Sequence, residues 1–166
     1  PIIINALSIY KNEGFQFKFY IVGSGPEEEY LKKLVADCDL QNEIEFTGQL
    51  KKPDLFKIYK KTDIYIQVSS YEGLPHVILE AISHNLSIIS TPIGGSNEIL
   101  MDGKNGWVWK LENNFLPEKN ELVEIINKIS TNPKDNENKK NNALNYLNEN
   151  FDEHKNFKEY LEIIKI

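Results

Sequence analysis

Apolar residues follow two kinds of pattern along the chain. Short apolar runs that fit buried strands alternate with segments in which apolar residues recur at helical spacing. Strands that alternate with helices predict parallel βαβ units, with right-handed crossovers and helices on both faces of a sheet. The sequence therefore predicts an α/β fold built on a doubly wound parallel sheet. The expected strands span residues 17–22, 43–47, 63–68, 87–90 and 106–110, and C-terminal helices are expected over about residues 118–130, 136–150 and 153–164.

Glycine and proline are concentrated in the loops that follow the predicted strands. The carboxyl ends of parallel strands meet at one edge of a sheet, and ligands of such folds bind at that edge. We therefore expect one ligand cleft at this edge. Four loops would line it: residues 23–26, 48–50, 69–75 and 92–95.

Proline and polar residues after the loops predict where three of the helices begin. Pro26 is expected to occupy the first position of the next helix, because its fixed φ suits that position. Pro75 is expected to begin a helix that runs through Ile82. Ser96 or Asn97 is expected to cap a short helix that runs through Met101.

Composition narrows the class of protein. The chain has 166 residues, 40% of them hydrophobic and 27% charged, which suits one domain with its own core. Its net charge is −6 and it contains no arginine, which argues against non-specific nucleic-acid binding. Lysine pairs at residues 51–52, 60–61 and 139–140 are interpreted as solvated helix faces, because acidic residues are scattered among them.

Cysteine content and the absence of long apolar runs bear on the cellular location of the protein. Cys38 is the only cysteine, so no internal disulfide can form, which fits a reducing, cytoplasmic setting. No apolar run approaches the roughly 20 residues of a membrane-spanning helix, and no signal peptide is recognised. The chain starts at Pro1 within a helical pattern, so we expect it to be a piece of a longer protein.

The segment from Glu72 to Glu80 carries the clearest chemical signal. The two glutamates are separated by seven residues; Glu72 falls in a loop and Glu80 in the helix that follows. A helix N-terminus offers backbone N–H groups and partial positive charge to a phosphate, and Gly73 would let the backbone approach closely. Spacing alone leaves open that both glutamates are ordinary solvated residues.

A resemblance favours the functional interpretation. The segment resembles the Glu-x7-Glu signature of the retaining group 1 glycosyltransferases, a family with the two-domain GT-B fold. Other segments resemble that family in the same order, over roughly residues 5–130. They span residues 21–26, 44–48, 55–59, 62–66, 69–73, 91–98 and 105–108. The resemblance implies that residues 1–166 form a Rossmann-like C-terminal domain that binds a nucleotide sugar, with residues 131–166 as a helical extension.

The resemblance also implies roles for individual residues. Glu72 would contact the donor sugar as the catalytic glutamate, and Glu80 would bind the ribose hydroxyls. Backbone amides of three residues would hold the distal phosphate, whereas Pro75 has no N–H to donate. The base would lie near a second loop, and a glycine turn would line the floor of the cleft. The residues expected to hold the phosphate are Gly73, Leu74 and His76. Those expected near the base are Gly48, Gln49 and Leu50, and those expected at the floor of the cleft are Gly23 and Gly25.

The implied reaction moves a sugar from a nucleoside diphosphate sugar, commonly a uridine derivative, to a hydroxyl acceptor with retention of configuration. No metal or other cofactor is expected, because helix dipole and backbone amides would stabilise the leaving diphosphate. The family's first C-terminal-domain strand, with its cationic residues, and the N-terminal acceptor-binding domain are absent from this sequence. We therefore expect weak donor binding and little or no turnover by this chain alone.

Three alternatives remain open from the sequence. A nucleotide-sugar epimerase of the same fold would isomerise the donor instead of transferring its sugar. A glycosidase would use two carboxylates on a simple glycoside. A non-catalytic nucleotide-binding module would share the fold without the reaction. The expected setting of the full enzyme is bacterial surface polysaccharide or glycolipid synthesis, with no nucleic-acid partner and peripheral membrane contact, if any, made by the full enzyme.

Overall fold

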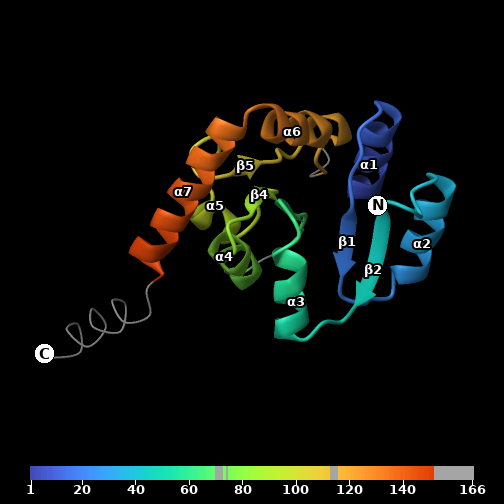
Figure 1. Ribbon diagram of the computed structural model, residues 1–166, viewed down its shortest axis with the longest axis horizontal. Helices are drawn as coiled ribbons and strands as arrows, with labels where there is room; N and C mark the ends of the chain where they lie inside the picture. Colours follow the sequence, from blue (N-terminus) through green and yellow to red (C-terminus); the bar gives the residue numbers. More distant parts are fainter. Residues whose placement is uncertain (70–72, 74, 113–115, 152–166) are drawn as a thin grey trace, which may run out of the picture. The chain divides into compact units, whose positions relative to one another are not determined.

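The computed structural model describes residues 1–69, 73, 75–112 and 116–151. The chain forms two compact units. The first contains residues 1–61 and 109–130, and the second contains residues 62–108 and the described residues from Thr131 onward. The chain therefore passes from the first unit to the second, returns for one helix, and ends in the second (Figure 1).

The first unit is built on a pair of parallel strands, β1 (Phe19–Val22) and β2 (Ile44–Gly48). The register shifts between Ile21 and Val22, so that Val22 lies opposite Gly48. Side chains from helices and from β2 share the apolar core of this unit, among them Leu7, Val35, Ile44 and Leu122. The helices are α1 (Ile2–Asn12), α2 (Glu28–Asp37), α3 (Lys52–Tyr59) and α6 (Lys119–Thr131).

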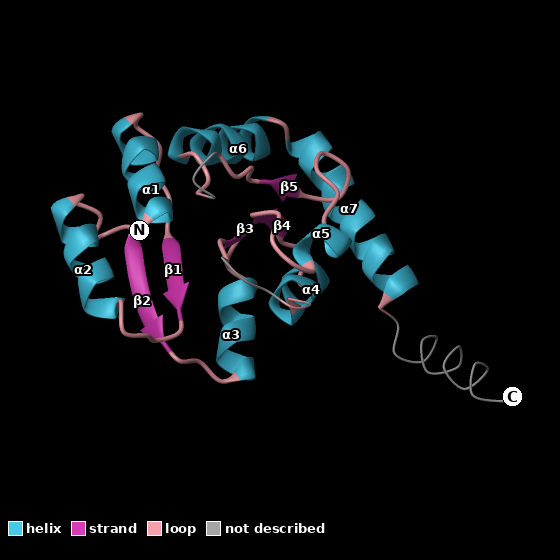
Figure 2. Ribbon diagram, turned by 180° about the vertical axis from the view of Figure 1, so that it is seen from behind, coloured by secondary structure: helices cyan, strands magenta, loops and turns pink. Residues whose placement is uncertain are grey.

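The second unit contains three parallel strands in the order β3 (Ile64–Gln67), β4 (Ser87–Ser90), β5 (Trp107–Val108). Every residue of the central strand β4 is buried. Helix α7 packs against α4 and β4. Figure 2 shows the strands of both units in magenta and the helices in cyan. The helices of the second unit are α4 (His76–Ser83), α5 (Ser96–Ile99) and α7 (Pro133–Asn150).

The predicted alternation of strands and helices is confirmed, and all strand pairs in the described sheets are parallel. The five strands form a two-stranded and a three-stranded sheet. Strands β1, β3 and β5 are shorter than their predicted ranges, whereas β2 is shifted by one residue and β4 matches its range. The helix expected over residues 153–164 lies outside the described residues.

Two predicted helix starts are wrong. Helix α2 begins at Glu28, two residues after Pro26, because the amide of Glu28 donates to the carbonyl of Gly25 and closes a turn there. Proline's fixed φ suits such a turn as well as it suits a helix.

Helix α5 is not capped by either predicted residue. Its N-cap is Gly95, with no side-chain cap, and Ser96 is its first residue. The hydroxyl of Ser96 is turned back toward the carbonyls of Thr91 and Ile93. The side-chain amide of Asn97 donates to the carbonyl of Pro92. The helix ends at Ile99, before the predicted Met101, because Leu100 has extended backbone angles (φ −107°, ψ 124°).

Candidate functional site

Two loops of the second unit leave the sheet from neighbouring strands. The loop after β3 and the loop after β4 start at the same edge, because the two strands are parallel and adjacent. The amide of Thr91 donates to the carbonyl of Gln67 at 3.2 Å, and the amide of Ser69 donates to the hydroxyl of Thr91 at 3.3 Å. Thr91 therefore ties together the first residues of both loops.

A second contact joins the two loops further from the sheet. The amide of Gly95 donates to the carbonyl of Gly73 at 2.9 Å. Gly73 is the exposed glycine that follows the first glutamate of the pair, and Gly95 belongs to the glycine pair before α5. The expectation that these two loops lie together is confirmed within this unit.

The hydroxyl of Ser96 holds the loop after β4 in its shape. It lies 2.9 Å from the carbonyl of Thr91 and 2.6 Å from the carbonyl of Ile93, and it accepts a hydrogen bond from the amide of Ile93 at 3.0 Å. Ser96 and Thr91 are 3% and 1% exposed. Sequence reasoning missed this support; the signal available was two hydroxyl residues on either side of a loop containing Gly94 and Gly95.

The N-terminus of α4 is where the sequence predicts that a phosphate binds. Pro75 is its N-cap, with no side-chain cap, and its first turn contains no acidic residue. His76 is the first helical residue and is exposed. The first N–H groups of a helix have no partner within the helix, and they carry partial positive charge. An anion placed here would meet these donors without competition from a carboxylate in the first turn.

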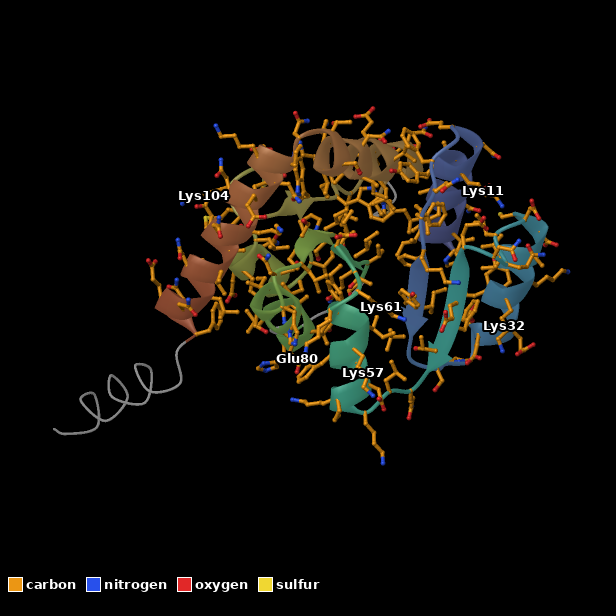
Figure 3. The ribbon with its side chains drawn as sticks, in the orientation of Figure 1. Lys11, Lys32, Lys57, Lys61, Glu80 and Lys104 are labelled. Atoms are coloured by element: carbon orange, nitrogen blue, oxygen red, sulfur yellow. The ribbon has the colours of Figure 1, made fainter. Side chains whose placement is uncertain are left out.

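Glu80 lies one turn further along α4. Figure 3 labels Glu80 on this helix. Glu80 follows His76 by four residues, so both side chains project from the same side of the helix, and Glu80 is half-buried. The backbone carbonyl oxygen of Glu80 lies 2.7 Å from the hydroxyl of Ser83 and 2.9 Å from Nδ1 of His84. A carboxylate accepts hydrogen bonds from two adjacent hydroxyls, which is the chemistry expected of a ribose contact.

Two residues predicted for this site, Glu72 and Leu74, lie outside the described residues. Their predicted contacts with the donor sugar and the phosphate therefore stay predictions. The structure places Gly73 in the loop between them and Glu80 on α4.

The first unit holds the other pair of loops. Gly23 follows β1 and Gly48 ends β2, and the amide of Gly23 donates to the carbonyl of Gly48 at 2.8 Å. Both glycines have positive φ, +113° and +66°, a conformation that side chains with a Cβ rarely adopt. The hydroxyl of Thr47 adds a hydrogen bond to the carbonyl of Ile21 at 3.3 Å. The two glycine loops therefore meet at the carboxyl edge of this sheet.

The backbone around these glycines is open. A Cβ built on Gly23, Gly25 or Gly48 would meet no atom within 4 Å. Gly25 and Gln49 are exposed, and Leu50 is half-buried. The structure thus brings the floor glycines beside the loop predicted for the base, with open space where a side chain would start.

Within the described ranges, no three His, Cys, Asp or Glu side chains gather as a metal site. The expectation that the reaction needs no metal stays a prediction. None of the described helices is both long and apolar enough to cross a bilayer.

Comparison with known proteins gives a consistent result. The model of the family "Glycosyl transferases group 1" matches residues 2–146. An uncharacterized glycosyltransferase of Methanocaldococcus jannaschii is 35% identical over 147 residues, which cover 87% of this chain and 36% of that protein. The amylovoran biosynthesis glycosyltransferase AmsK of Erwinia amylovora is 27% identical over 113 residues, which cover 64% of this chain and 28% of that protein.

A solved structure shows the same fold. The crystal structure of HepE from Anabaena in complex with UDP superposes with a TM-score of 0.81 at 22% identity, over 98% of this chain and 44% of that one. The expected fold class is therefore confirmed. The chain spans about a third of the length of the curated relatives described above.

The paired glycine loops, the glutamate-bearing helix and the strand order all fall within the stretch that the family model matches, from residue 2 to residue 146. The chain belongs to the group 1 glycosyltransferase family.

Proposed function

We propose that this chain is the donor-binding part of a retaining glycosyltransferase. The full protein would move a sugar from a nucleoside diphosphate sugar to a hydroxyl acceptor, and the acceptor would be bound by another part of the protein. The observation that carries the proposal is the match of the family model to residues 2–146, which includes both glycine loops and α4. Retention follows the resemblance of residues 72–80 to the Glu-x7-Glu signature.

Each loop has a proposed role. The start of α4, with the amides of Gly73, Leu74 and His76, would hold the distal phosphate through N–H groups and the helix dipole. Glu80 would bind the ribose hydroxyls, and Glu72 would contact the donor sugar. The loop containing Gly48, Gln49 and Leu50 would hold the base, and Gly23 and Gly25 would lie beneath it. Backbone amides and the helix dipole would stabilise the charge of the leaving diphosphate, and the proposed reaction uses no metal ion.

We propose uridine diphosphate as the carrier, because HepE, a protein of the same fold, was crystallised with UDP. Surface polysaccharide synthesis is proposed as the setting, because AmsK is named for amylovoran biosynthesis. The proposed location of the full enzyme is the cytoplasm, at or near the inner face of the membrane.

A binding experiment tests the proposal. Titration of the chain with UDP and with UDP-glucose, followed by amide chemical shifts, should perturb residues of the loops after β1, β2, β3 and β4. ADP and GDP serve as base controls. Absence of any shift change with every nucleotide at millimolar concentration would contradict the proposal.

Glu80→Gln tests the ribose contact. A hydrogen bond to a charged group contributes about 1.5–3 kcal/mol, so we expect UDP affinity to fall by about 10- to 100-fold. Glu124→Gln is the matched control: Glu124 is exposed on α6 and pairs with Lys128 at 3.7 Å. That variant should keep the affinity of the parent chain.

Two glycine substitutions test whether a ligand approaches the backbone. A Cβ added at Gly25 or Gly73 would meet no atom within 4 Å, and neither glycine has the positive φ that excludes other residues. Gly25→Ala and Gly73→Ala should therefore leave the melting temperature nearly unchanged. A loss of UDP affinity in these variants would then come from contact between the added methyl group and the nucleotide. Unchanged affinity in both would contradict the proposed loop contacts.

A further inference from the structure

One turn of the second unit contains a chemically labile pair of residues. Asn105 and Gly106 form the only Asn-Gly sequence in the chain. In water the backbone nitrogen that follows an asparagine can attack the side-chain amide carbon, and glycine hinders this attack least because it has no Cβ. Asparagine is accordingly one of the thermolabile residue types. An Asn-Gly sequence in a flexible chain is therefore a site of deamidation.

The side chain of Asn105 is buried and makes two hydrogen bonds. Its Oδ1 accepts the amide of Met101 at 2.7 Å, and its Nδ2 donates to the carbonyl of Ile99 at 2.9 Å. Ile99 is the last residue of α5, so the second bond satisfies a carbonyl at the end of this helix. Asn105 is 2% exposed. Figure 3 labels its neighbour Lys104 in the same turn.

The backbone that would make the attack is tightly packed. A Cβ built on Gly106 would lie 2.8 Å from Cδ2 of Leu100 and 3.4 Å from the carbonyl oxygen of Ile88, and both of these residues are buried. The carbonyl of Gly106 accepts the amide of Gly103 at 3.1 Å. The attack needs the Asn105 side chain and the Gly106 peptide unit to rotate toward each other. The folded turn holds both of them in place.

We propose that Asn105 is a deamidation site that is unreactive while the second unit is folded and reacts when the turn over residues 101–106 opens. In the reaction the Gly106 nitrogen bonds to Cγ of Asn105, and Nδ2 leaves as ammonia with the proton of the Gly106 amide. Water then opens the cyclic imide at either carbonyl carbon, which gives aspartate or isoaspartate. This modification goes beyond the proposed function and does not depend on nucleotide binding.

Neither product fits the closed turn. In aspartate an oxygen replaces Nδ2, so the carbonyl of Ile99 loses its donor and meets another acceptor in a buried position. In isoaspartate the backbone is one methylene longer beside Gly106, where packing is already tight. Opening of the turn is reversible, whereas loss of ammonia to the solvent is not. A chain that reacts while it is open therefore loses the hydrogen bond at the end of α5 permanently.

Deamidation of folded and unfolded chains tests the proposal. The chain is incubated at mildly alkaline pH with and without guanidinium chloride and then cleaved after glutamate. The resulting peptide, residues 99–112, contains Asn105 as its only asparagine and has no glutamine, so its mass reports on this site alone. We expect the reaction in buffer to be at least about tenfold slower than in denaturant, because opening must precede the attack. In denaturant, Gly106→Ala should slow the reaction, since the added Cβ hinders the attack.

Two aspartate substitutions test whether opening of this turn sets the rate. The carboxylate of Asp102 accepts the amide of Val108 at 3.1 Å and so joins the turn to β5. Asp102→Ala should raise the deamidation rate of the folded chain at least about threefold and leave the rate in denaturant unchanged. The matched control is Asp54→Ala, because Asp54 is exposed on α3 in the first unit. It should change the rate less than about twofold.

A third pair of variants tests the effect of the product. Asn105→Asp places an aspartate in the turn from the start and should lower the melting temperature by at least about 4 °C. Loss of cooperative unfolding in this variant would meet the same expectation. Asn138→Asp adds the same charge at an exposed position of α7 and should change the melting temperature by less than about 2 °C.

Four results would overturn the proposal. The first is deamidation of Asn105 as fast in buffer as in denaturant, which would show that folding does not protect it. The second is a rate in denaturant no higher at Asn105 than at the other asparagines. The third is an equal change of rate in Asp102→Ala and Asp54→Ala. The fourth is an equal melting temperature of Asn105→Asp and Asn138→Asp, which would show that the product fits the turn.

Discussion

The hydroxyl of Ser96 lies 2.9 Å from the carbonyl of Thr91, inside the loop that leads into α5. The same hydroxyl accepts the amide of Ile93, so one buried oxygen organises three backbone groups of the loop. The loop in turn donates the Gly95 amide to the carbonyl of Gly73. Ser96, which the sequence suggested only as a helix cap, therefore helps to position the loop that contacts Gly73.

Ser96→Ala should destabilise the second unit. The variant removes the buried hydroxyl and leaves the carbonyls of Thr91 and Ile93 without this donor, which costs about 1–2 kcal/mol. Urea unfolding followed by circular dichroism measures the change. The control is Ser83→Ala, because the Ser83 hydroxyl is exposed and bonds only the carbonyl of Glu80 and the ring of His84 among the contacts described. Equal stability of the two variants would contradict the role of Ser96.

Gly48→Ala should destabilise the first unit without any steric clash. Gly48 has φ +66° and open space around its Cβ position, so the cost is conformational, about 1–2 kcal/mol. Gly25→Ala is the matched control, because Gly25 has the same open space without a positive φ. Thermal unfolding of the two variants checks this difference. A melting temperature lowered equally in both would show that φ is not the cause.

Strand limits were predicted well from the sequence where turn-forming residues flank an apolar run. Strand β4 matches its predicted range, Ser87–Ser90, because Asn85 turns the chain before it with φ +62° and Thr91 starts a loop after it. The start of α2 was predicted two residues early. Proline is common both in β-turns and in the first turn of a helix, so the local sequence around Pro26 does not tell which of the two forms there.

Part of the site's architecture depends on a contact between segments distant in sequence. The hydrogen bond from Gly95 to Gly73 joins residues 22 positions apart, and it exists because β3 and β4 are neighbours in the sheet. The glycine motifs predicted that loops meet at the strands' carboxyl ends, but they carried no information on which amide meets which carbonyl. The orientation of the Ser96 hydroxyl has a local origin instead, because it bonds the carbonyls of Thr91 and Ile93 within the same loop.

Gly106→Ala should destabilise the second unit through overpacking. A Cβ at Gly106 would lie 2.8 Å from Cδ2 of Leu100 and 3.4 Å from the carbonyl oxygen of Ile88. Leu100 is 5% exposed, so it has little room to move, and we expect a cost of about 1–3 kcal/mol. Equilibrium unfolding in urea provides the measurement.

A second substitution tests the cause assigned to Gly106. In a Leu100→Val background the side chain that meets the new methyl group is shorter. Gly106→Ala should therefore cost less there than in the parent chain, with a coupling of about 0.5–1.5 kcal/mol. Strict additivity of the two changes would contradict the contact with Leu100.

The two tryptophans should differ sharply in their contribution to stability. Trp109 is fully buried, and its Nε1 donates to the carbonyl of Glu118 at 2.8 Å, which joins the chain after β5 to the start of α6. Trp107 is half-buried; its Nε1 has no hydrogen-bond partner in the described part of the chain, and the ammonium of Lys139 lies 4.6 Å from its ring. Trp109→Phe removes a hydrogen bond and leaves a cavity, so it should cost about 2–3 kcal/mol. Trp107→Phe removes an N–H that has no such bond, so it should cost less than about 1.5 kcal/mol.

These two residues are the only tryptophans in the chain, so each variant keeps a single fluorescent reporter. The Trp107→Phe chain reports on the first unit through Trp109, and the Trp109→Phe chain reports on the second through Trp107. Urea unfolding followed by fluorescence and by circular dichroism gives both stabilities. Equal destabilisation by Trp107→Phe and Trp109→Phe would contradict this prediction. It would show that the hydrogen bond to Glu118 and the full burial of Trp109 do not make Trp109 the more important residue for stability.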